Sequence, residues 1–366
     1  MIRIATIGTS MITRNFLQVL GEREDARFVG TLSRDAERAA AFTPEHGGTC
    51  PFTELKRLAA SPDVDAVYIA SPNALHREQA IACIEGGKHV LVEKPFAANE
   101  REAREVFAAA ARAGVVAMEA MRPLHDPAFH QCVDALGALG RIRRATLRFG
   151  KYSSRYDEIL AGRHTNIFDA AMASGALMDI GVYCVEPLIA LFGEPSSISC
   201  APVLLDPETR ELAHGPIDGA GVILARYEDM VASVHYSKIT TDLSPNQIEG
   251  ERGTLTLDAV SAPQHARIDL RGEAHRTAAA KDGYSSTKTL CTEINIPACD
   301  NTMCHELADF IAAVEAVRTG EDPDKAPAGP FGTIGRFRNV TLRSLALMDE
   351  ARHQAGIVFP TDAVRA

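Results

Sequence analysis

The sequence predicts an α/β protein in two parts. A doubly wound parallel sheet is expected over residues 1–122, and an α+β domain with an open, mostly antiparallel sheet over residues 123–366. Residues 1–120 alternate short apolar segments with helix-like segments, which is typical of parallel strands covered by crossover helices on both faces. After about residue 120, β-like segments follow one another with turn residues between them, which favours antiparallel pairing.

In the first part, the apolar segments predict strands and the segments between them predict helices. Asn99 is expected to cap the last of these helices, with Glu102 three residues further on in a capping-box arrangement. The expected strands are residues 2–7, 27–32, 65–70, 89–92 and 115–118, and the expected helices are residues 11–20, 35–42, 74–85 and 99–112.

The second part is expected to contain a buried central helix and two amphipathic helices at its end. The central helix stops at Gly193, which is followed by Pro195, a common helix-ending pair. Two polar stretches, residues 206–219 and 272–286, are expected to be exposed loops. The expected helices are residues 127–139, 176–192, 302–318 and 334–355, and the expected strands are residues 141–150, 196–205, 221–227, 231–238, 246–251, 254–257, 266–270 and 287–296.

Charge and composition argue against several classes of protein. The chain has 38 Lys and Arg against 48 Asp and Glu, a formal net charge of −10, so nucleic acid and anionic membranes are poor partners. No apolar run is expected to reach the roughly 18–20 residues of a membrane helix, and secretion is not expected, because residues 1–5 lead directly into a strand pattern. The eight scattered cysteines fit reduced thiols in a cytoplasmic protein. Cys299, Cys304 and His305 match no common zinc spacing, so no metal is expected.

The turn after the first strand has the composition of an incomplete phosphate-binding loop. Residues 8–13 read GTSMIT and run into a helix whose N-terminal amides can face a pyrophosphate. Only the first glycine of the GxGxxG pattern is present. We expect Gly8, Ser10, Met11 and Ile12 to contact a dinucleotide, with the Ser10 hydroxyl replacing close backbone approach. The alternative is an ordinary strand-to-helix turn capped by Ser10.

The end of the second strand indicates which dinucleotide binds. NAD-specific sites carry an acidic residue there, which holds the ribose 2′-hydroxyl. Here the strand ends in Ser33 and Arg34, with Arg38 one helical turn further on, and these groups suit the 2′-phosphate of NADP. Asp35 is expected to cap the next helix instead. NADP is therefore the preferred cofactor and NAD the second choice, unless Arg34 is simply a solvated surface residue.

Two further strand ends carry polar residues where ligands of open α/β sheets bind. Ser71, Asn73 and His76 follow the third strand and open a helix. Glu93 and Lys94 end the fourth strand directly before a proline, an awkward pair for packing alone. We expect all five residues to contact the cofactor.

These motifs resemble the glucose–fructose oxidoreductase / inositol dehydrogenase / rhizopine-catabolism (Gfo/Idh/MocA) family. The resemblance rests on SPNALH at 71–76, GKHVLVEKP at 87–95 and GALMDIGVY at 175–183, in the family's order and spacing. It implies an N-terminal Rossmann domain and a C-terminal domain that binds substrate and assembles through its open sheet into homodimers or homotetramers. It also implies NAD(P)-linked oxidation or reduction of sugars, polyols or related compounds.

By position, the resemblance implies that Lys94 is catalytic near the nicotinamide, with Asp179 and the residue four further on completing the site. That residue is histidine in many members and Tyr183 here, as in the dihydrodiol and xylose dehydrogenase branch. In a helix over residues 176–192, Asp179 and Tyr183 share a face. A nearby Lys94 ammonium would stabilise the Tyr183 phenolate, so that Tyr183 can move the substrate proton. The alternative is a partly buried aspartate beside a packed tyrosine.

Other polar residues near the expected cleft are further candidates. Arg122 and His125 follow the last strand of the first sheet, and Asn166 lies in a polar stretch that could cover the pocket. With Lys94, Asp179 and Tyr183, these three residues form the expected substrate-binding set. An exposed loop explains equally well the neighbouring polar residues Tyr152, Arg155, Tyr156, His164 and Asp169.

The sequence thus predicts an NAD(P)-dependent oxidoreductase that transfers a hydride between a nicotinamide and a sugar, polyol or dihydrodiol-like substrate. One alternative is an NADP-binding regulator without turnover, suggested by the incomplete phosphate loop. The other is a glycosidase that uses bound NAD for transient oxidation.

Overall fold

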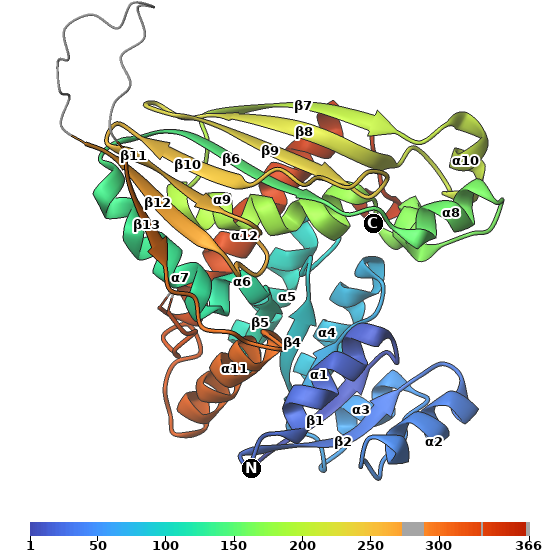
Figure 1. Cartoon of the computed structure of the whole chain (residues 1–366). Helices are drawn as coiled ribbons and strands as arrows, with labels where there is room; N and C mark the ends of the chain where they lie inside the picture. The colour runs from blue at the N-terminus through green and yellow to red at the C-terminus, as the bar shows by residue number, and fades with distance from the viewer. Residues whose placement is uncertain (273–288, 331, 364–366) are drawn as a thin grey trace, which may run out of the picture.

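The computed structural model describes residues 1–272, 289–330 and 332–363, which form two sheets with helices between and around them (Figure 1). The first sheet is entirely parallel, with the strand order β2-β1-β3-β4-β5. Its strands are apolar throughout because helices bury both faces. The strands are β1 (Ile2–Ile7), β2 (Ala26–Leu32), β3 (Ala66–Ile69), β4 (His89–Glu93) and β5 (Ala117–Ala120).

The helices of the first part begin where the sequence predicts caps. The Asn99 side chain accepts a hydrogen bond from the Glu102 N–H at 2.9 Å, and the Asp35 side chain accepts one from the Arg38 N–H at 3.1 Å. The expected strand at 115–118 lies two residues later, and a short helix, α3, was not expected. The helices are α1 (Met11–Gly21), α2 (Ala36–Glu45), α3 (Leu55–Ala60), α4 (His76–Glu85) and α5 (Glu100–Ala113).

The second sheet is eight-stranded, with the order β13-β12-β11-β10-β6-β9-β8-β7. The β6–β9 pair is parallel, and every other neighbouring pair is antiparallel. The mostly antiparallel sheet is therefore confirmed. The strands are β6 (Ile142–Gly150), β7 (Ser197–Leu204), β8 (Asp218–Arg226), β9 (Val231–Ser237), β10 (Asn246–Gly250), β11 (Gly253–Leu257), β12 (Ala266–Arg271) and β13 (Thr289–Ile294).

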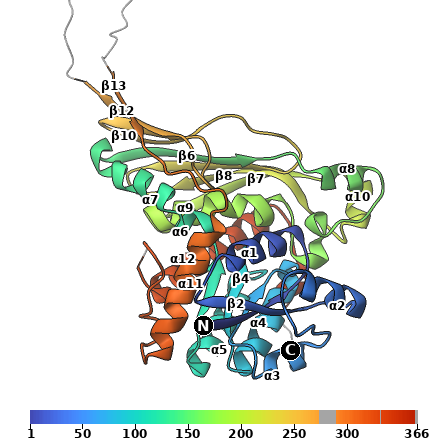
Figure 2. The same cartoon turned by 60° about the horizontal axis from the view of Figure 1, so that its bottom comes forward.

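Two long helices of the second part, α9 and α12, lie between the two sheets (Figures 1 and 2). α9 packs on β6 and β9, and α12 packs on α9 and β7. The expected loop at 206–219 contains a short helix, α10, and most of the expected loop at 272–286 lies outside the described residues. The helices are α6 (Arg122–His125), α7 (Pro127–Asp134), α8 (Ser154–Leu160), α9 (Val182–Phe192), α10 (Pro207–Leu212), α11 (Met303–Arg318) and α12 (Ile334–Gln354).

The expectation that no apolar run approaches the length of a membrane helix was wrong. Among the described residues, the segment Ala170–Phe192 has the length and apolar composition of a membrane span, with a mean hydropathy of 1.6 in its most apolar window. However, 78% of that window is buried inside the protein. The segment ends in α9, so its hydrophobicity is that of a core helix under the second sheet.

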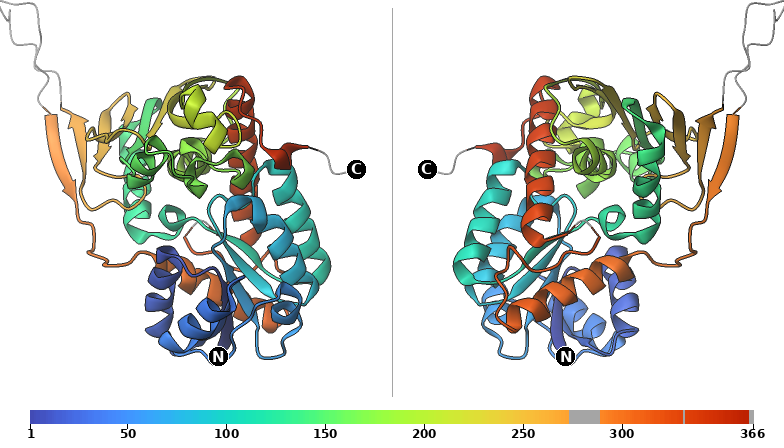
Figure 3. Two further views of the ribbon diagram at one scale, coloured as in Figure 1. Left: turned by 90° about the vertical axis from the view of Figure 1, so that its right-hand side faces the viewer. Right: turned by 90° about the vertical axis from the view of Figure 1, so that its left-hand side faces the viewer.

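The last two helices return to the first sheet. α11 packs on α1 and β5, and α12 packs on α5 and β5; both views of Figure 3 show α12 (red) near the helices of the first part. The division of the chain after residue 122 therefore stays a prediction, because residues from the end of the chain complete the first half of the molecule.

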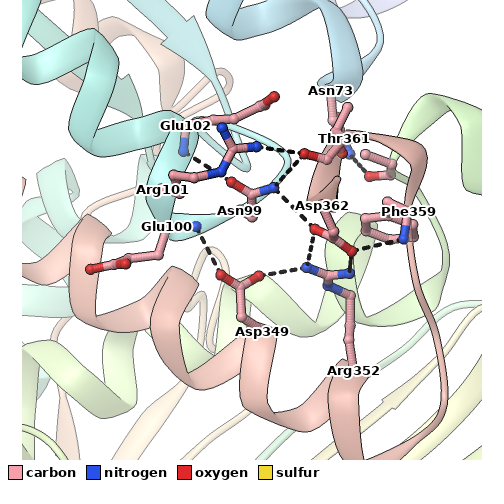
Figure 4. A network of polar contacts seen from close by, with 11 residues as sticks. Asn73, Asn99, Glu100, Arg101, Glu102, Asp349, Arg352, Phe359, Thr361 and Asp362 are labelled. Atoms are coloured by element: carbon pink, nitrogen blue, oxygen red, sulfur yellow. Dashed lines mark hydrogen bonds and ion pairs between the residues drawn. The ribbon is translucent and has the colours of Figure 1, made fainter. Parts of the chain in front are cut away.

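A partly buried polar network joins the C-terminal end to α5 (Figure 4). Asp362 accepts hydrogen bonds from Arg352 at 2.8 Å and from the Asn99 side-chain amide at 3.0 Å. Arg352 is only 3% exposed and also donates to Asp349 at 2.6 Å. Asp349 in turn accepts from the Glu100 N–H at the start of α5. This network fixes the position of the first part against α12.

We expect Asp362→Ala to lower the free energy of unfolding by about 1–3 kcal/mol, because Arg352 loses one of its two carboxylate partners inside the protein. The Arg352 contact outweighs the effect of burial and holds the pKa of Asp362 below its ordinary value of 3.8. The stabilisation is therefore complete above pH 3.8 and is lost as the pH falls through the lower folded-state pKa.

Urea denaturation at pH 7 and at decreasing pH measures both effects. The matched control is Asp229→Ala, which removes an exposed carboxylate paired with Arg141 and Arg143 and should cost less than about 1 kcal/mol. Equal losses for the two variants, or a loss at Asp362 that does not shrink in acid, would contradict this account.

Candidate active site

The residues expected to bind the cofactor gather at one edge of the first sheet. Because β1 to β4 are parallel, their carboxyl ends meet there, and each is followed by a predicted residue: Gly8, Ser33, Ser71 and Lys94. The chain runs outward from β1 to β2 and then crosses back to β3 on the other side of β1. Such a topological switch point is where open α/β sheets bind their ligands.

The turn after β1 fits a dinucleotide. Gly8 has φ +108°, and a Cβ there would lie 2.7 Å from the Ala70 carbonyl oxygen. Only glycine therefore allows the ends of β1 and β3 to approach so closely. Ser10 stands at the N-cap of α1 without a side-chain capping hydrogen bond, so its hydroxyl does not serve the ordinary capping role. The N-terminal amides of α1 and this hydroxyl are suited to a pyrophosphate.

The two missing glycines have different consequences. Ser10 and Met11 are exposed, and Ile12 is half-buried, so the side chains at the start of α1 line the open edge of the turn. Thr13, at the third glycine position, is fully buried, and its hydroxyl has no hydrogen-bond partner among the described residues. The Thr13 side chain is therefore packed between the helix and the strands and does not face the phosphate-binding side of the turn.

The end of β2 presents groups to solvent. Arg34 and Arg38 are both exposed. Arg38 forms a long ion pair with Asp35, with 4.0 Å between the nitrogen and the carboxylate oxygen. The Ser33 hydroxyl accepts a hydrogen bond from the Asp35 N–H at 3.2 Å. Asp35 faces its own helix as an N-cap, so the open side of this turn carries two arginines that a phosphate can engage.

The residues after β3 and β4 are mainly internal. His76 is fully buried, with its ring nitrogens 2.8 and 3.1 Å from the carbonyl oxygens of Ser71 and Pro95. Glu93 is buried and accepts a hydrogen bond from the Tyr68 hydroxyl. His76 therefore supports the loops that carry Ser71 and Lys94, and its direct contact with a cofactor, like that of Glu93, stays a prediction.

Asn73 and Ser71 lie at the boundary between the two parts of the chain. The Asn73 side-chain amide donates to the Ala173 carbonyl oxygen at 2.8 Å, and the Ser71 hydroxyl donates to Gln79 at 2.6 Å. The Asn73 contact ties the cofactor edge of the first sheet to the turn that precedes Asp179.

Lys94 reaches across to the second part of the chain. Its ammonium donates to the Asp179 carbonyl oxygen at 2.7 Å and to Asp179 Oδ1 at 3.0 Å. The other carboxylate oxygen, Oδ2, accepts from Lys238 at the end of β9. Within the described chain, these contacts use two of the three N–H groups of Lys94, which leaves one for a substrate oxygen.

The charges of this cluster are stable. Burial opposes ionisation of Asp179, but Lys94 and Lys238 outweigh it and hold the pKa of Asp179 well below its ordinary value. Burial likewise opposes charge on Lys94, but Asp179 outweighs it and raises the pKa of Lys94 above its ordinary value. An ammonium group at this position can polarise a substrate oxygen.

Asp179 lies in an unusual helical turn. Residues Leu177–Gly181 form a π-helical turn that leads into α9, and such turns are frequent at functional sites. A Cβ at Gly181 would lie 3.2 Å from the ring of Tyr236, so the glycine permits a close approach to its backbone. Gly175 has φ +113°, and a Cβ there would lie 2.3 Å from Asp218 Oδ1, so this position also requires glycine.

Tyr183 lies beside two cations. Arg122 donates to its hydroxyl at 3.3 Å, and the Lys94 ammonium is 4.9 Å from the centre of its ring. The contact with Tyr183 raises the pKa of Arg122 above its ordinary value. Lys94 therefore faces the ring of the tyrosine, whereas Arg122 bonds to the hydroxyl, and the guanidinium is the nearer group for stabilising a phenolate.

The structure does not bring His125 and Asn166 to this cluster. His125 is 1% exposed and contacts Asp309 at 2.7 Å and the ring of Phe337. Asn166 is exposed in a turn of residues 166–168. Sequence reasoning missed Lys238, because the sequence Ser-Lys-Ile after a strand carries no signal that its side chain bonds to Asp179, 59 residues away.

Comparisons with known proteins agree with this geometry. Residues 2–121 match the model of an oxidoreductase family with an NAD-binding Rossmann fold, and residues 130–256 match the GFO/IDH/MocA C-terminal domain. The chain is 37% identical over 362 residues to scyllo-inositol 2-dehydrogenase (NADP(+)) of Bacillus subtilis, with 99% of each chain covered. It is 30% identical over 263 residues to human trans-1,2-dihydrobenzene-1,2-diol dehydrogenase, covering 70% of this chain and 74% of the relative.

The fold also matches a solved structure, a 3-ketoreductase from Actinomadura kijaniata in complex with NADP and TDP-benzene. The TM-score is 0.75 with 24% sequence identity, and the match covers 96% of this chain and 97% of the other. Together, the matches of both halves and the two sheets show that the chain belongs to the Gfo/Idh/MocA family and is an NAD(P)-dependent oxidoreductase that acts on CH–OH groups.

Proposed function

We propose that the enzyme interconverts a ring hydroxyl and a ketone on a cyclic polyol, with NADP(H) as its preferred cofactor. The observation that carries this proposal is the cluster of Lys94, Asp179, Tyr183 and Arg122 beside the switch point of the first sheet. It combines one free N–H donor with a phenol held next to a guanidinium. The inositol dehydrogenase similar over 99% of each chain supports the choice of a cyclic polyol over an open-chain substrate.

The roles of the residues follow from their contacts. When bound, the nicotinamide supplies or accepts the hydride. Lys94 holds the substrate oxygen through its remaining N–H group. Tyr183 gives a proton to that oxygen during reduction and takes it during oxidation, and Arg122 stabilises the phenolate. Asp179 and Lys238 hold the ammonium in position.

A panel of substrates tests the function. We expect the purified protein to reduce NADP with inositol isomers and to show weaker activity with open-chain polyols, aldoses and dihydrodiols. Tight cofactor retention with glycoside cleavage and no net NADP reduction would favour a glycosidase. Cofactor binding without turnover of any substrate in the panel would favour a regulator. The incomplete phosphate loop is the observation behind the regulator, and the intact Lys94 cluster argues against it.

The cofactor preference is a separate prediction. Because Arg34 and Arg38 are exposed beside the end of β2 and can engage a 2′-phosphate, NADPH should bind more tightly than NADH by about 1.5–3 kcal/mol. Arg34→Ala should reduce that difference, whereas Arg27→Ala, an exposed arginine at the other end of β2, should not change it. Isothermal titration of both cofactors measures the difference, and equal affinities in the unmodified protein would contradict the prediction.

We also propose a homodimer or homotetramer formed through the second sheet, in a cytoplasmic enzyme. In Figure 1, α9 and α12 lie under this sheet, and its upper face carries no helix among the described residues. Val203, Leu224 and Val231 are 45–53% exposed there, and such apolar side chains on an open sheet are typical of an interface.

Light scattering measures the assembly. We expect a mass of at least two chains at micromolar concentration, and Leu224→Lys should weaken it by burying a charge. Val358→Lys is the matched control, since Val358 is equally apolar and 66% exposed but lies outside the sheet. A single-chain mass for the unmodified protein would reject the prediction.

A further inference from the structure

Away from the catalytic cluster, three side chains that can ligate a metal converge. His164 Nε2 lies 2.7 Å from Asp169 Oδ2, and His214 Nδ1 lies 2.8 Å from Asp169 Oδ1. All three ligand atoms lie within 4.8 Å of one another. We propose that His164, Asp169 and His214 form a binding site for a divalent transition-metal ion of the zinc type.

The carboxylate between the two imidazoles is almost fully buried. The Asp169 side chain is 1% exposed, and Oδ1 also accepts from the Ala171 N–H at 2.8 Å. In the part of the chain that the structure describes, no Lys or Arg forms an ion pair with it. Burying a carboxylate is costly unless it is paired or coordinates a metal. A divalent cation bound between the two imidazoles would pair with this carboxylate.

The chemistry of the ligands selects the ion. Two imidazole nitrogens and one carboxylate oxygen suit zinc and its neighbours in the transition series, whereas calcium and magnesium prefer oxygen ligands alone. The side chains of His164 and His214 are 43% and 58% exposed, so an ion can enter from solvent and keep water in its remaining positions.

The side chains must adjust before they can hold an ion. Zinc bonds of 2.0–2.2 Å place neighbouring tetrahedral ligands about 3.3 Å apart. His164 Nε2 and His214 Nδ1 contact different oxygens of Asp169, at 2.7 and 2.8 Å, so each nitrogen must move away from its oxygen for an ion to bind between them. Both histidines have exposed side chains that can make this movement, while Asp169 stays in place through its backbone contacts.

The site connects two loops, one of which continues along the chain to Asp179 in the catalytic cluster. Asp169 begins the turn that contains Ala173, the acceptor of the Asn73 amide, and continues to Asp179. His214 follows α10, and the Ala170 N–H already donates to the Ala213 carbonyl oxygen at 2.8 Å across the same loops. A bound ion would cross-link these loops, so it should stabilise the fold.

Zinc titration of the full-length, tag-free protein after treatment with a chelator tests the site. We expect one equivalent of zinc to bind and to raise the melting temperature. His214→Gln and His164→Gln should each weaken binding at least 10-fold and remove most of the thermal shift. His353→Gln is the matched control, because His353 is exposed in the last turn of α12 and should leave both unchanged.

A second cluster makes the test discriminating. Cys299, Cys304 and His305 also have ligand atoms within 4.8 Å of one another, and the two sulfurs are 3.8 Å apart. With Co²⁺ in place of zinc, ligation by His164, Asp169 and His214 gives a spectrum without a thiolate-to-metal charge-transfer band. Absence of zinc binding, or binding that persists in His214→Gln and is lost in Cys299→Ser, would overturn the proposal.

Discussion

Lys94→Met is expected to lower kcat by about 10²–10⁴-fold, the range for loss of a group that assists proton transfer. Methionine keeps most of the length of the side chain but removes the ammonium. The substrate oxygen then loses its N–H donor, and Lys238 is the one cationic partner that Asp179 keeps among the described residues. The effect should fall on kcat more than on cofactor affinity, because Lys94 bonds to Asp179 and not to the phosphate turn.

Steady-state kinetics on the best polyol of the panel, together with cofactor titration, measure this effect. Lys56→Met is the matched control, since Lys56 is exposed on α3, and it should keep full activity. Lys238→Met should have a smaller effect than Lys94→Met, because it removes a positioning contact and leaves the substrate donor. Nearly unchanged activity in Lys94→Met, with the protein folded, would show that the ammonium has only a structural role.

Tyr183→Phe is expected to cost a similar factor, about 10²–10⁴-fold in kcat. The substitution removes one hydroxyl and keeps the ring, which packs edge-on to Phe149 at 5.6 Å between ring centres, so the fold should survive. Arg122 loses its hydroxyl acceptor, and no group remains at that position to exchange the substrate proton. Cofactor affinity should change little.

The combination of the two variants separates catalysis from packing. Lys94→Met with Tyr183→Phe should be little worse than either single variant, because residues that act as a unit are not additive. If Tyr183→Phe keeps more than half of the activity on the true substrate, the tyrosine is a packing residue. The proton would then have to be carried by another group, and His125 is too deeply buried against Asp309 to serve without rearrangement.

Much of the fold could be predicted because the relevant signals are local. The strand at residues 2–7 is found at those bounds, and Asn99 caps α5, because short apolar runs and capping depend on residues a few positions apart. The short helices α3, α6, α8 and α10 were not predicted, since helices of fewer than about eight residues depend on tertiary packing more than on propensity.

The sequence by itself determined the family, the two sheets and the residues at the strand ends, since each of these depends on motifs that are continuous in the chain. Only the tertiary structure decided which of those residues meet. Lys94 and Asp179 are 85 residues apart, and Lys238 lies in a strand end without a motif. His164, Asp169 and His214 likewise come together only because the loops before α9 and after α10 pack side by side. Contacts of this kind depend on how the elements pack in space, so no local pattern of residues records them.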